Sequence, residues 1–232
     1  MESRRPIQWV WVLTVVLLAA PSAVDAAYVL PMIGGGQVPM AQAPMKHVDI
    51  AFDGTNITLD VDQVVPTPLL RPLTPPDEFD PAQPWSVLQN KAYNYQYAWN
   101  PGGIFAPPAG TSVWVERLSH DSGLEVFARP PKFWTDPWPN PWPALFVSDG
   151  ERWKWGGTMT HNAYAVRDPL QSVYTASYRV YIGDAVTGNP VPGYGSADVT
   201  LTLNATPVPE PAALALLGCS LVGLALRRRP VV

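Results

Sequence analysis

Proline density is the feature that most restricts what this chain can fold into. Of its 28 prolines, 22 lie between Ala27 and Thr206, which is about 12% of that stretch against a usual ~5%. Proline removes a backbone hydrogen-bond donor, and its ring clashes with the preceding helical turn. The middle of the chain therefore cannot be mostly helical, and we expect an all-β fold with long proline-rich loops.

Alternating hydrophobicity indicates where the strands lie. In "HVDIAFDGTNITLDVD" (47–62), every second residue is apolar on both sides of an Asp53-Gly54 turn, which predicts a β-hairpin. "QSVYTASYRVYIGD" (171–184) keeps the same period over a longer strand. Because each strand leaves one face polar and turn signals are frequent, we predict a single antiparallel β-sandwich over residues 47–206.

Other segments complete this picture. Residues 27–46 are small and rich in glycine and proline, so we expect a flexible lead-in. Residues 65–84 hold seven prolines and predict a long extended surface connection. The further strand candidates are "YNYQYAW" (93–99), "TSVWVERL" (111–118), "GLEVFA" (123–128), "ERWKWGGTMTHNAYAV" (151–166) and "DVTLTLNAT" (198–206).

The first 26 residues have the layout of a secretory signal peptide. Arg4 and Arg5 give a positive start, residues 7–20 are nearly all apolar, and small residues precede Ala27. We therefore expect the N-terminal helix of a signal peptide at residues 1–26, cleavage after it, and secretion across the inner membrane.

The other end of the chain contains a second apolar stretch. Residues 212–226 carry no charge and would rise roughly 22 Å as a helix, against a hydrocarbon core of about 30 Å. The arginines at 227–229 can snorkel toward the lipid headgroups and hold that end in the cytoplasm. This pattern predicts a short C-terminal transmembrane helix at 212–226, beginning just after a sharp proline-rich boundary.

These C-terminal parts resemble a known signal. Their order is a Pro-Glu-Pro motif, an apolar span and an arginine cluster. It resembles the PEP-CTERM sorting signal of Gram-negative-type bacteria, so we identify residues 207–232 as a sorting tail. The residues that carry the resemblance are Val208, Pro209, Glu210, Pro211, Arg227, Arg228 and Arg229.

The resemblance implies a destination for the protein. In that family an exosortase, a membrane-embedded enzyme similar to cysteine transpeptidases, processes the tail and passes the protein to the outer surface. The implied partners are therefore the exosortase and, transiently, the inner membrane, and the implied location is the cell surface or the extracellular matrix. The resemblance supplies no activity for the residues between the two signals.

Composition excludes several classes of function. Residues 27–206 carry 10 Lys and Arg against 16 Asp and Glu, without charge runs, so no basic patch favours nucleic-acid binding. Cys219 is the only cysteine and lies in the tail, which excludes a disulfide, a thiolate metal site or a cysteine nucleophile in the body. No G-x-S-x-G elbow or phosphate-binding glycine loop occurs. We expect no catalytic residues, and a structural or binding function rather than an enzyme.

Metal binding is the first alternative. His47 and Asp49 lie two apart on a predicted strand and would project from the same face. His161 and His120 come from other strand regions, and three histidines with a carboxylate suit zinc or copper. In the competing interpretation each histidine is a surface or locally hydrogen-bonded residue, and the protein needs no cofactor.

A second, shorter resemblance concerns these residues. The His-x-Asp strand at 47–49 and the later "WKWGGTMTHNAY" are similar to segments of surface-anchored PEP-CTERM proteins, some of which are associated with metal homeostasis. Those proteins tend to have a His-x-His pair in the later segment, where this chain has only His161.

Carbohydrate binding is the second alternative. Trp134, Trp138 and Trp142 lie among four prolines in residues 132–147. Exposed aromatic rings on a β-sandwich can stack on sugar faces, so this segment is a candidate platform for exopolysaccharide. Large aromatic side chains also routinely fill cores and cover loops, which is the competing interpretation.

Overall fold

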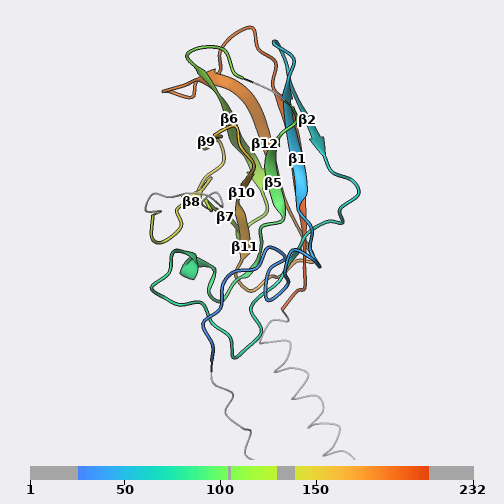
Figure 1. The fold of residues 1–232 in the computed structure, drawn as a ribbon, viewed down its shortest axis with the longest axis vertical. Helices are drawn as coiled ribbons and strands as arrows, with labels where there is room; N and C mark the ends of the chain where they lie inside the picture. The colour runs from blue at the N-terminus through green and yellow to red at the C-terminus, as the bar shows by residue number, and fades with distance from the viewer. Residues whose placement is uncertain (1–25, 104–105, 130–138, 209–232) are drawn as a thin grey trace, which may run out of the picture.

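A computed structural model of the chain describes residues 26–103, 106–129 and 139–208. These residues form strands and loops almost throughout (Figure 1), which confirms the predicted all-β class. Except for residue 26, the predicted signal peptide lies outside the described residues, as does the predicted transmembrane helix at 212–226. Within the described ranges, no helix has the length and apolar character needed to cross a membrane.

The strands are short except for three long ones near the middle and end of the chain. A 3₁₀ helix, η1 (Pro84–Leu88), lies between the third and fourth strands. In chain order the strands are β1 (Lys46–Phe52), β2 (Ile57–Val61), β3 (Leu69–Leu70), β4 (Ala92–Asn94), β5 (Tyr97–Pro101), β6 (Thr111–His120), β7 (Leu124–Phe127), β8 (Ala144–Leu145), β9 (Arg152–Lys154), β10 (Thr160–His161), β11 (Ala163–Val166), β12 (Val173–Asp184) and β13 (Ala197–Ala205).

Three sheets share one main core. The largest has the order β3, β13, β12, β6 and β9; the others are β10, β5, β1 and β2, and β4, β11, β7 and β8. The chain passes directly from one of the smaller sheets to the other at two places, from β4 into β5 and from β10 into β11. In Figure 1 the long strands β6 and β12 lie alongside the layer of β5, β1 and β2, and buried residues of both layers make up the main core.

Strand pairing departs from the prediction in one respect. Most described pairs are antiparallel, as expected, but β1 pairs with β5 and β13 pairs with β3 in parallel. Parallel neighbours need a crossover connection of about a dozen residues or more, and the stretch between β1 and β5 is long enough to supply one. The sandwich is therefore mixed rather than purely antiparallel.

The predicted hairpin is present as β1 and β2. Val48 pairs with Val61 and Phe52 with Ile57, which places the apolar positions of both strands on one side. The turn is fixed by Asp53, whose carboxylate Oδ1 accepts hydrogen bonds from the backbone N–H groups of Thr55 (2.8 Å) and Asn56 (2.6 Å).

Strand β12 supplies the centre of the core. Its alternate residues are buried as the sequence predicts. Trp99 of β5 packs edge-to-face on Tyr178, with ring centroids 5.5 Å apart, so the two layers meet through aromatic side chains. The inward positions of β12 are Tyr174, Ala176, Tyr178, Val180 and Ile182, and near the end of the strand Tyr181 and Gly183 on the opposite side are buried as well.

The segment "YNYQYAW" is two strands, although alternation predicts one. The break lies at Tyr95 and Gln96, where the Asn94 side chain accepts a hydrogen bond from the Gln96 backbone N–H (2.7 Å). Such local bonds compete with the strand ladder. All residues from 92 to 99 are buried, because the main core covers one side and a second cluster, which includes Tyr93 and Phe127, covers the other.

Residues 27–46, expected as a flexible lead-in, pack against this second cluster. Ile33 and Ala43 are buried. The Tyr93 hydroxyl donates to the Gly36 carbonyl (2.9 Å) and accepts from the Met32 backbone N–H (3.0 Å). The glycines that suggested mobility instead allow the backbone to approach Tyr93 closely.

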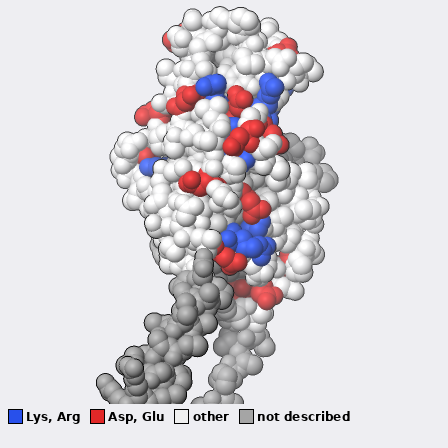
Figure 2. Space-filling model, turned by 180° about the vertical axis from the view of Figure 1, so that it is seen from behind, with Lys and Arg blue, Asp and Glu red and all other residues white. Residues whose placement is uncertain are grey.

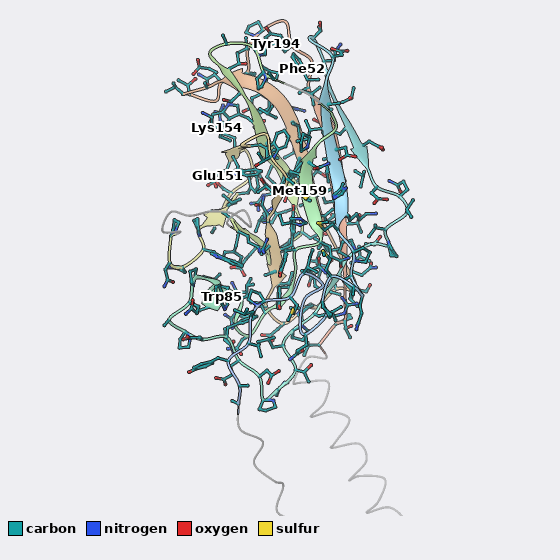
Figure 3. All side chains as sticks on the ribbon, in the orientation of Figure 1. Phe52, Trp85, Glu151, Lys154, Met159 and Tyr194 are labelled. Atoms are coloured by element: carbon teal, nitrogen blue, oxygen red, sulfur yellow. The ribbon has the colours of Figure 1, made fainter. Side chains whose placement is uncertain are left out.

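The two ends of the described chain lie at the same end of the body. Residues 26 and 208 are both at the bottom of Figure 1, below the strands. Phe52 and Tyr194 mark the opposite end (Figure 3), where their rings pack edge-to-face at 5.8 Å. The body thus has one end that carries both chain termini and one end that points away from them.

Candidate functional site

Two of the three predicted metal histidines lie on one face of a sheet. His47 of β1 and His161 of β10 both pair with Ala98 of β5, one from each side. Residues paired in this way project from the same face. His47 Nε2 is buried without a hydrogen-bond partner in the described part of the chain, and His161 Nδ1 lies 2.8 Å from the Tyr95 carbonyl oxygen.

The environment of His161 favours its neutral form. Burial is the main cause that lowers the pKa of His161 from 6.5 to about 4, and the charges of Arg129 and His47 add to it. The hydrogen bond with the Tyr95 carbonyl works in the opposite direction. Asp49, the predicted carboxylate ligand, accepts a hydrogen bond from Asn100 Nδ2 (2.7 Å) on the neighbouring strand.

His120 is not part of this group. It ends β6, in the other layer of the sandwich, and its Nδ1 lies 2.8 Å from Asp149 Oδ1. Across the described ranges, no group of three or more His, Cys, Asp and Glu side chains is placed to hold a metal ion. The structure therefore brings together His47 and His161 but not the four-residue metal shell.

Arg117 lies close to His120 and was not singled out from the sequence. It takes an inward position of β6, after Val113 and Val115, and is only 1% exposed. The sequence does indicate it, because in "TSVWVERL" a charged residue follows Val113 and Val115 at a position where alternation predicts an apolar one. Its Nε donates to Asp149 Oδ1 at 3.0 Å, so Asp149 joins Arg117 to His120.

Asp149 is the acidic partner of this cluster, on the turn before β9. Desolvation opposes its ionisation, but hydrogen bonds from His120 and Arg117 outweigh that effect and hold the pKa of Asp149 below its ordinary value. The turn is tied to β6 by backbone hydrogen bonds from Gly150 to the Arg117 carbonyl (2.7 Å) and from Arg117 to the Glu151 carbonyl (3.0 Å).

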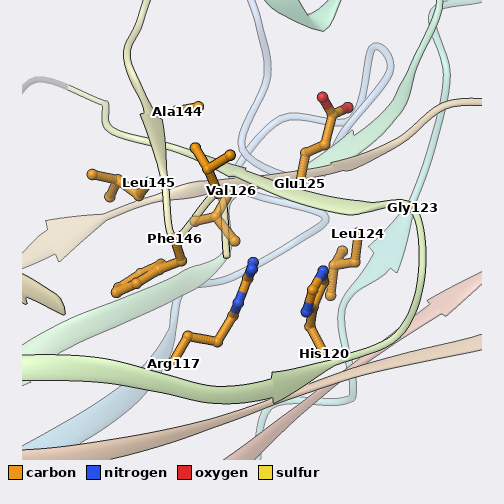
Figure 4. A pocket seen from close by; sticks show the side chains of 10 residues that line it. Arg117, His120, Gly123, Leu124, Glu125, Val126, Ala144, Leu145 and Phe146 are labelled. Carbon is orange, nitrogen blue, oxygen red and sulfur yellow. The ribbon is translucent and has the colours of Figure 1, made fainter. Parts of the chain in front are cut away.

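A pocket of about 190 Å³ opens beside Arg117, His120 and Asp149, between β6, β7, β8 and the residues that follow β8. Figure 4 shows Arg117 and His120 rising from β6 toward Leu124 and Val126 of β7, while Glu125 points the other way. The lining residues are Arg117, His120, Gly123, Leu124, Glu125, Val126, Ala144, Leu145, Phe146 and Val147.

Of the three tryptophans predicted to bind carbohydrate, the structure describes only Trp142, and its ring is not available to stack on a sugar. Trp142 is 4% exposed and packs edge-to-face on Trp85 of η1, with ring centroids 6.3 Å apart. Its ring therefore fills the second cluster instead of facing solvent. Trp134 and Trp138 lie outside the described residues.

The face of the molecule seen in Figure 2 has no large patch of only acidic or only basic side chains. Acidic and basic side chains lie next to one another there, and most of the remaining area is uncharged. Arg179 and Asp198 illustrate the pattern, since their side chains pair at 3.0 Å between β12 and β13. Surface pairs of this kind contribute little to stability.

Comparisons with known proteins bear on the tail. A comparison with curated proteins finds no match, and neither does one with solved structures. The model of the PEP-CTERM protein-sorting motif matches residues 207–229, which confirms the tail identified from Pro209, Glu210 and Pro211. The chain therefore carries a PEP-CTERM sorting motif directly behind β13, the last strand in the described residues, and this motif marks it as an exosortase-sorted protein of the cell surface or exterior.

Proposed function

We propose that this chain is a non-catalytic surface protein whose β-sandwich is delivered to the cell exterior by its tail and serves there as a structural or binding body. The tail holds the protein at the inner membrane for a time, and the exosortase then removes it. Cell surface or extracellular matrix is the resulting location.

One observation carries this proposal. Strand β13 ends at Ala205, and the sorting motif begins at residue 207. In the largest sheet, β13 lies between β3 and β12, so a strand held on both sides connects directly to the motif. Residues 26 and 208 share one end of the body (Figure 1). Until the tail is removed, a body attached in this way presents its opposite end, with Phe52 and Tyr194, away from the membrane.

Loss of the Pro-Glu-Pro motif is expected to stop delivery without unfolding the body. The variant Pro209→Ala, Glu210→Ala and Pro211→Ala removes the extended segment in front of the apolar span. We expect it to stay in the inner-membrane fraction of an exosortase-containing host, where the unaltered protein reaches the exterior. Fractionation followed by immunoblotting measures the difference.

Two controls accompany this experiment. Pro192→Ala changes a proline in an exposed loop far from the tail and is expected to be delivered normally. The unaltered protein in a host without exosortase is expected to behave like the motif variant. Normal delivery of the motif variant, or delivery that is indifferent to exosortase, would contradict the proposal.

A further inference from the structure

The pocket beside β6 contains an arginine whose hydrogen bonds are incomplete. The Nε of Arg117 is paired with Asp149, but its Nη2 is buried and has no partner among the residues that the structure describes. A buried N–H group is unfavourable when it is left without an acceptor. Among the described residues, Arg117 Nη2 therefore still needs a hydrogen-bond acceptor.

The side chains that face the pocket combine two kinds of chemistry. Arg117 supplies nitrogen donors on one side, with the imidazole of His120 beside it, while Leu124, Val126 and Phe146 supply apolar walls (Figure 4). This combination suits a ligand with an acceptor group at one end and an apolar body at the other.

The acidic side chains nearby do not occupy the pocket's interior. Glu125 points away from Arg117 in Figure 4 and pairs with Lys91 at 2.6 Å. Asp149 receives both Arg117 Nε and His120 Nδ1 on the same oxygen, Oδ1, and is not among the lining residues. An anionic group in the pocket would thus meet donors rather than a facing carboxylate.

The dimensions and the backbone of the pocket support a small ligand. A cavity of about 150 Å³ accommodates benzene in a protein interior, so 190 Å³ leaves room for one six-membered ring and a carboxylate. Phe146, which forms one wall, has φ +54°, a left-handed conformation that a non-glycine side chain rarely adopts. Such conformations persist where the surrounding structure holds them, commonly at ligand sites.

We infer that this pocket binds a small monocarboxylate with a compact apolar body. The carboxylate accepts a hydrogen bond from Arg117 and, when the His120 ring carries both protons, a second one from its Nε2, because the Nδ1 proton is already donated to Asp149. The apolar body lies against Val126 and Phe146. The planar guanidinium group matches a carboxylate in geometry and charge, which explains an arginine at an inward position of β6. The inference concerns the body alone and does not depend on how the protein is delivered.

Benzoate is the probe that tests this inference on the unaltered protein. We expect saturable changes in the amide NMR signals of residues at the pocket, such as Val126 and Phe146. Benzamide has the same shape without the charge and is expected to bind at least about tenfold more weakly, because it loses the charge-assisted bonds to Arg117. Acetate, which lacks the apolar body, is expected to bind more weakly than benzoate as well.

Matched arginine variants locate the site. Arg117→Gln is expected to weaken benzoate binding about tenfold or more, whereas Arg179→Gln, on the outer face of β12, is expected to leave it unchanged. Should Arg117→Gln fail to fold, the comparison of benzoate with benzamide on the unaltered protein decides alone. Equal affinity for those two compounds, or no saturable change with benzoate, would overturn the inference.

Discussion

Replacing Gly35 by alanine is expected to lower the free energy of unfolding by about 3 kcal/mol or more. The residue has φ +76°, and an added Cβ would lie 1.9 Å from the Tyr93 carbonyl oxygen. That oxygen accepts a hydrogen bond from the Arg71 backbone N–H, so it cannot move away without breaking a pairing. Relief requires residues 31–38 to leave the second cluster, which exposes Ile33. Urea denaturation measures the loss.

Gly54 provides the matched control for this prediction. It also has a positive φ, +99°, but nothing lies within 4 Å of an added Cβ. Gly54→Ala is therefore expected to cost only the backbone strain, about 1 kcal/mol. If both variants lose the same stability, residues 27–46 do not pack as described, and the flexible lead-in predicted from the sequence would be the better account.

Acidification is expected to destabilise the protein through His161. Its pKa is about 4 in the folded protein and close to 6.5 in the unfolded chain. Between these values the unfolded chain binds a proton that the folded protein does not, so stability falls as pH decreases from 6.5 and the loss is complete below 4. The full loss is about 3 kcal/mol. Urea denaturation at several pH values measures it, and NMR titration of the imidazole measures the pKa directly.

Substitution separates His161 from the other groups that titrate in this range. His161→Asn removes the ionisable ring, so the loss of stability between pH 6.5 and 4 should shrink by about 3 kcal/mol relative to the unaltered protein. A titration of His161 near pH 6.5 would contradict the buried position beside Tyr95 and Arg129.

The sequence predicted those strands that have one buried and one exposed face. In β1, β2 and the first half of β12, alternation is clean because one face is more exposed than the other. The turn between β1 and β2 could be predicted from Asp53 and Gly54. Alternation carries no information about which strand lies beside which. The parallel pairing of β1 with β5 could therefore not be predicted.

The features that the sequence did not predict share a physical cause. Residues 92–99 are all buried, so the alternation of Asn94 and Gln96 with the tyrosines does not mark a solvent-exposed face, and the bend made by Asn94 arises from a side-chain bond rather than from a hydropathy pattern. Residues 27–46 look mobile from composition, yet their packing depends on contacts with Tyr93, far away in the chain.

The candidate site also has features that the sequence could predict and features that depend on how the strands are arranged. Same-strand geometry predicted that His47 and Asp49 share a face, and the sheet adds His161 to it through Ala98. The placement of His120 in the other layer depends on strand order and could not be read from spacing. Arg117 could have been identified from the sequence, because it is a charged residue at a β6 position where alternation predicts an apolar one. Its partner Asp149 could not, because it lies on a turn distant in the sequence.

The mass of the protein recovered from outside the cell tests the central claim of tail-directed sorting most directly. The account predicts a polypeptide that begins at Ala27 and ends before residue 212, without the apolar span and the arginine cluster. Such a protein also lacks Cys219, its only cysteine, so a thiol-reactive label should mark the precursor and not the exported form. An exported protein that retains the mass of the tail and labels at Cys219 would contradict the account.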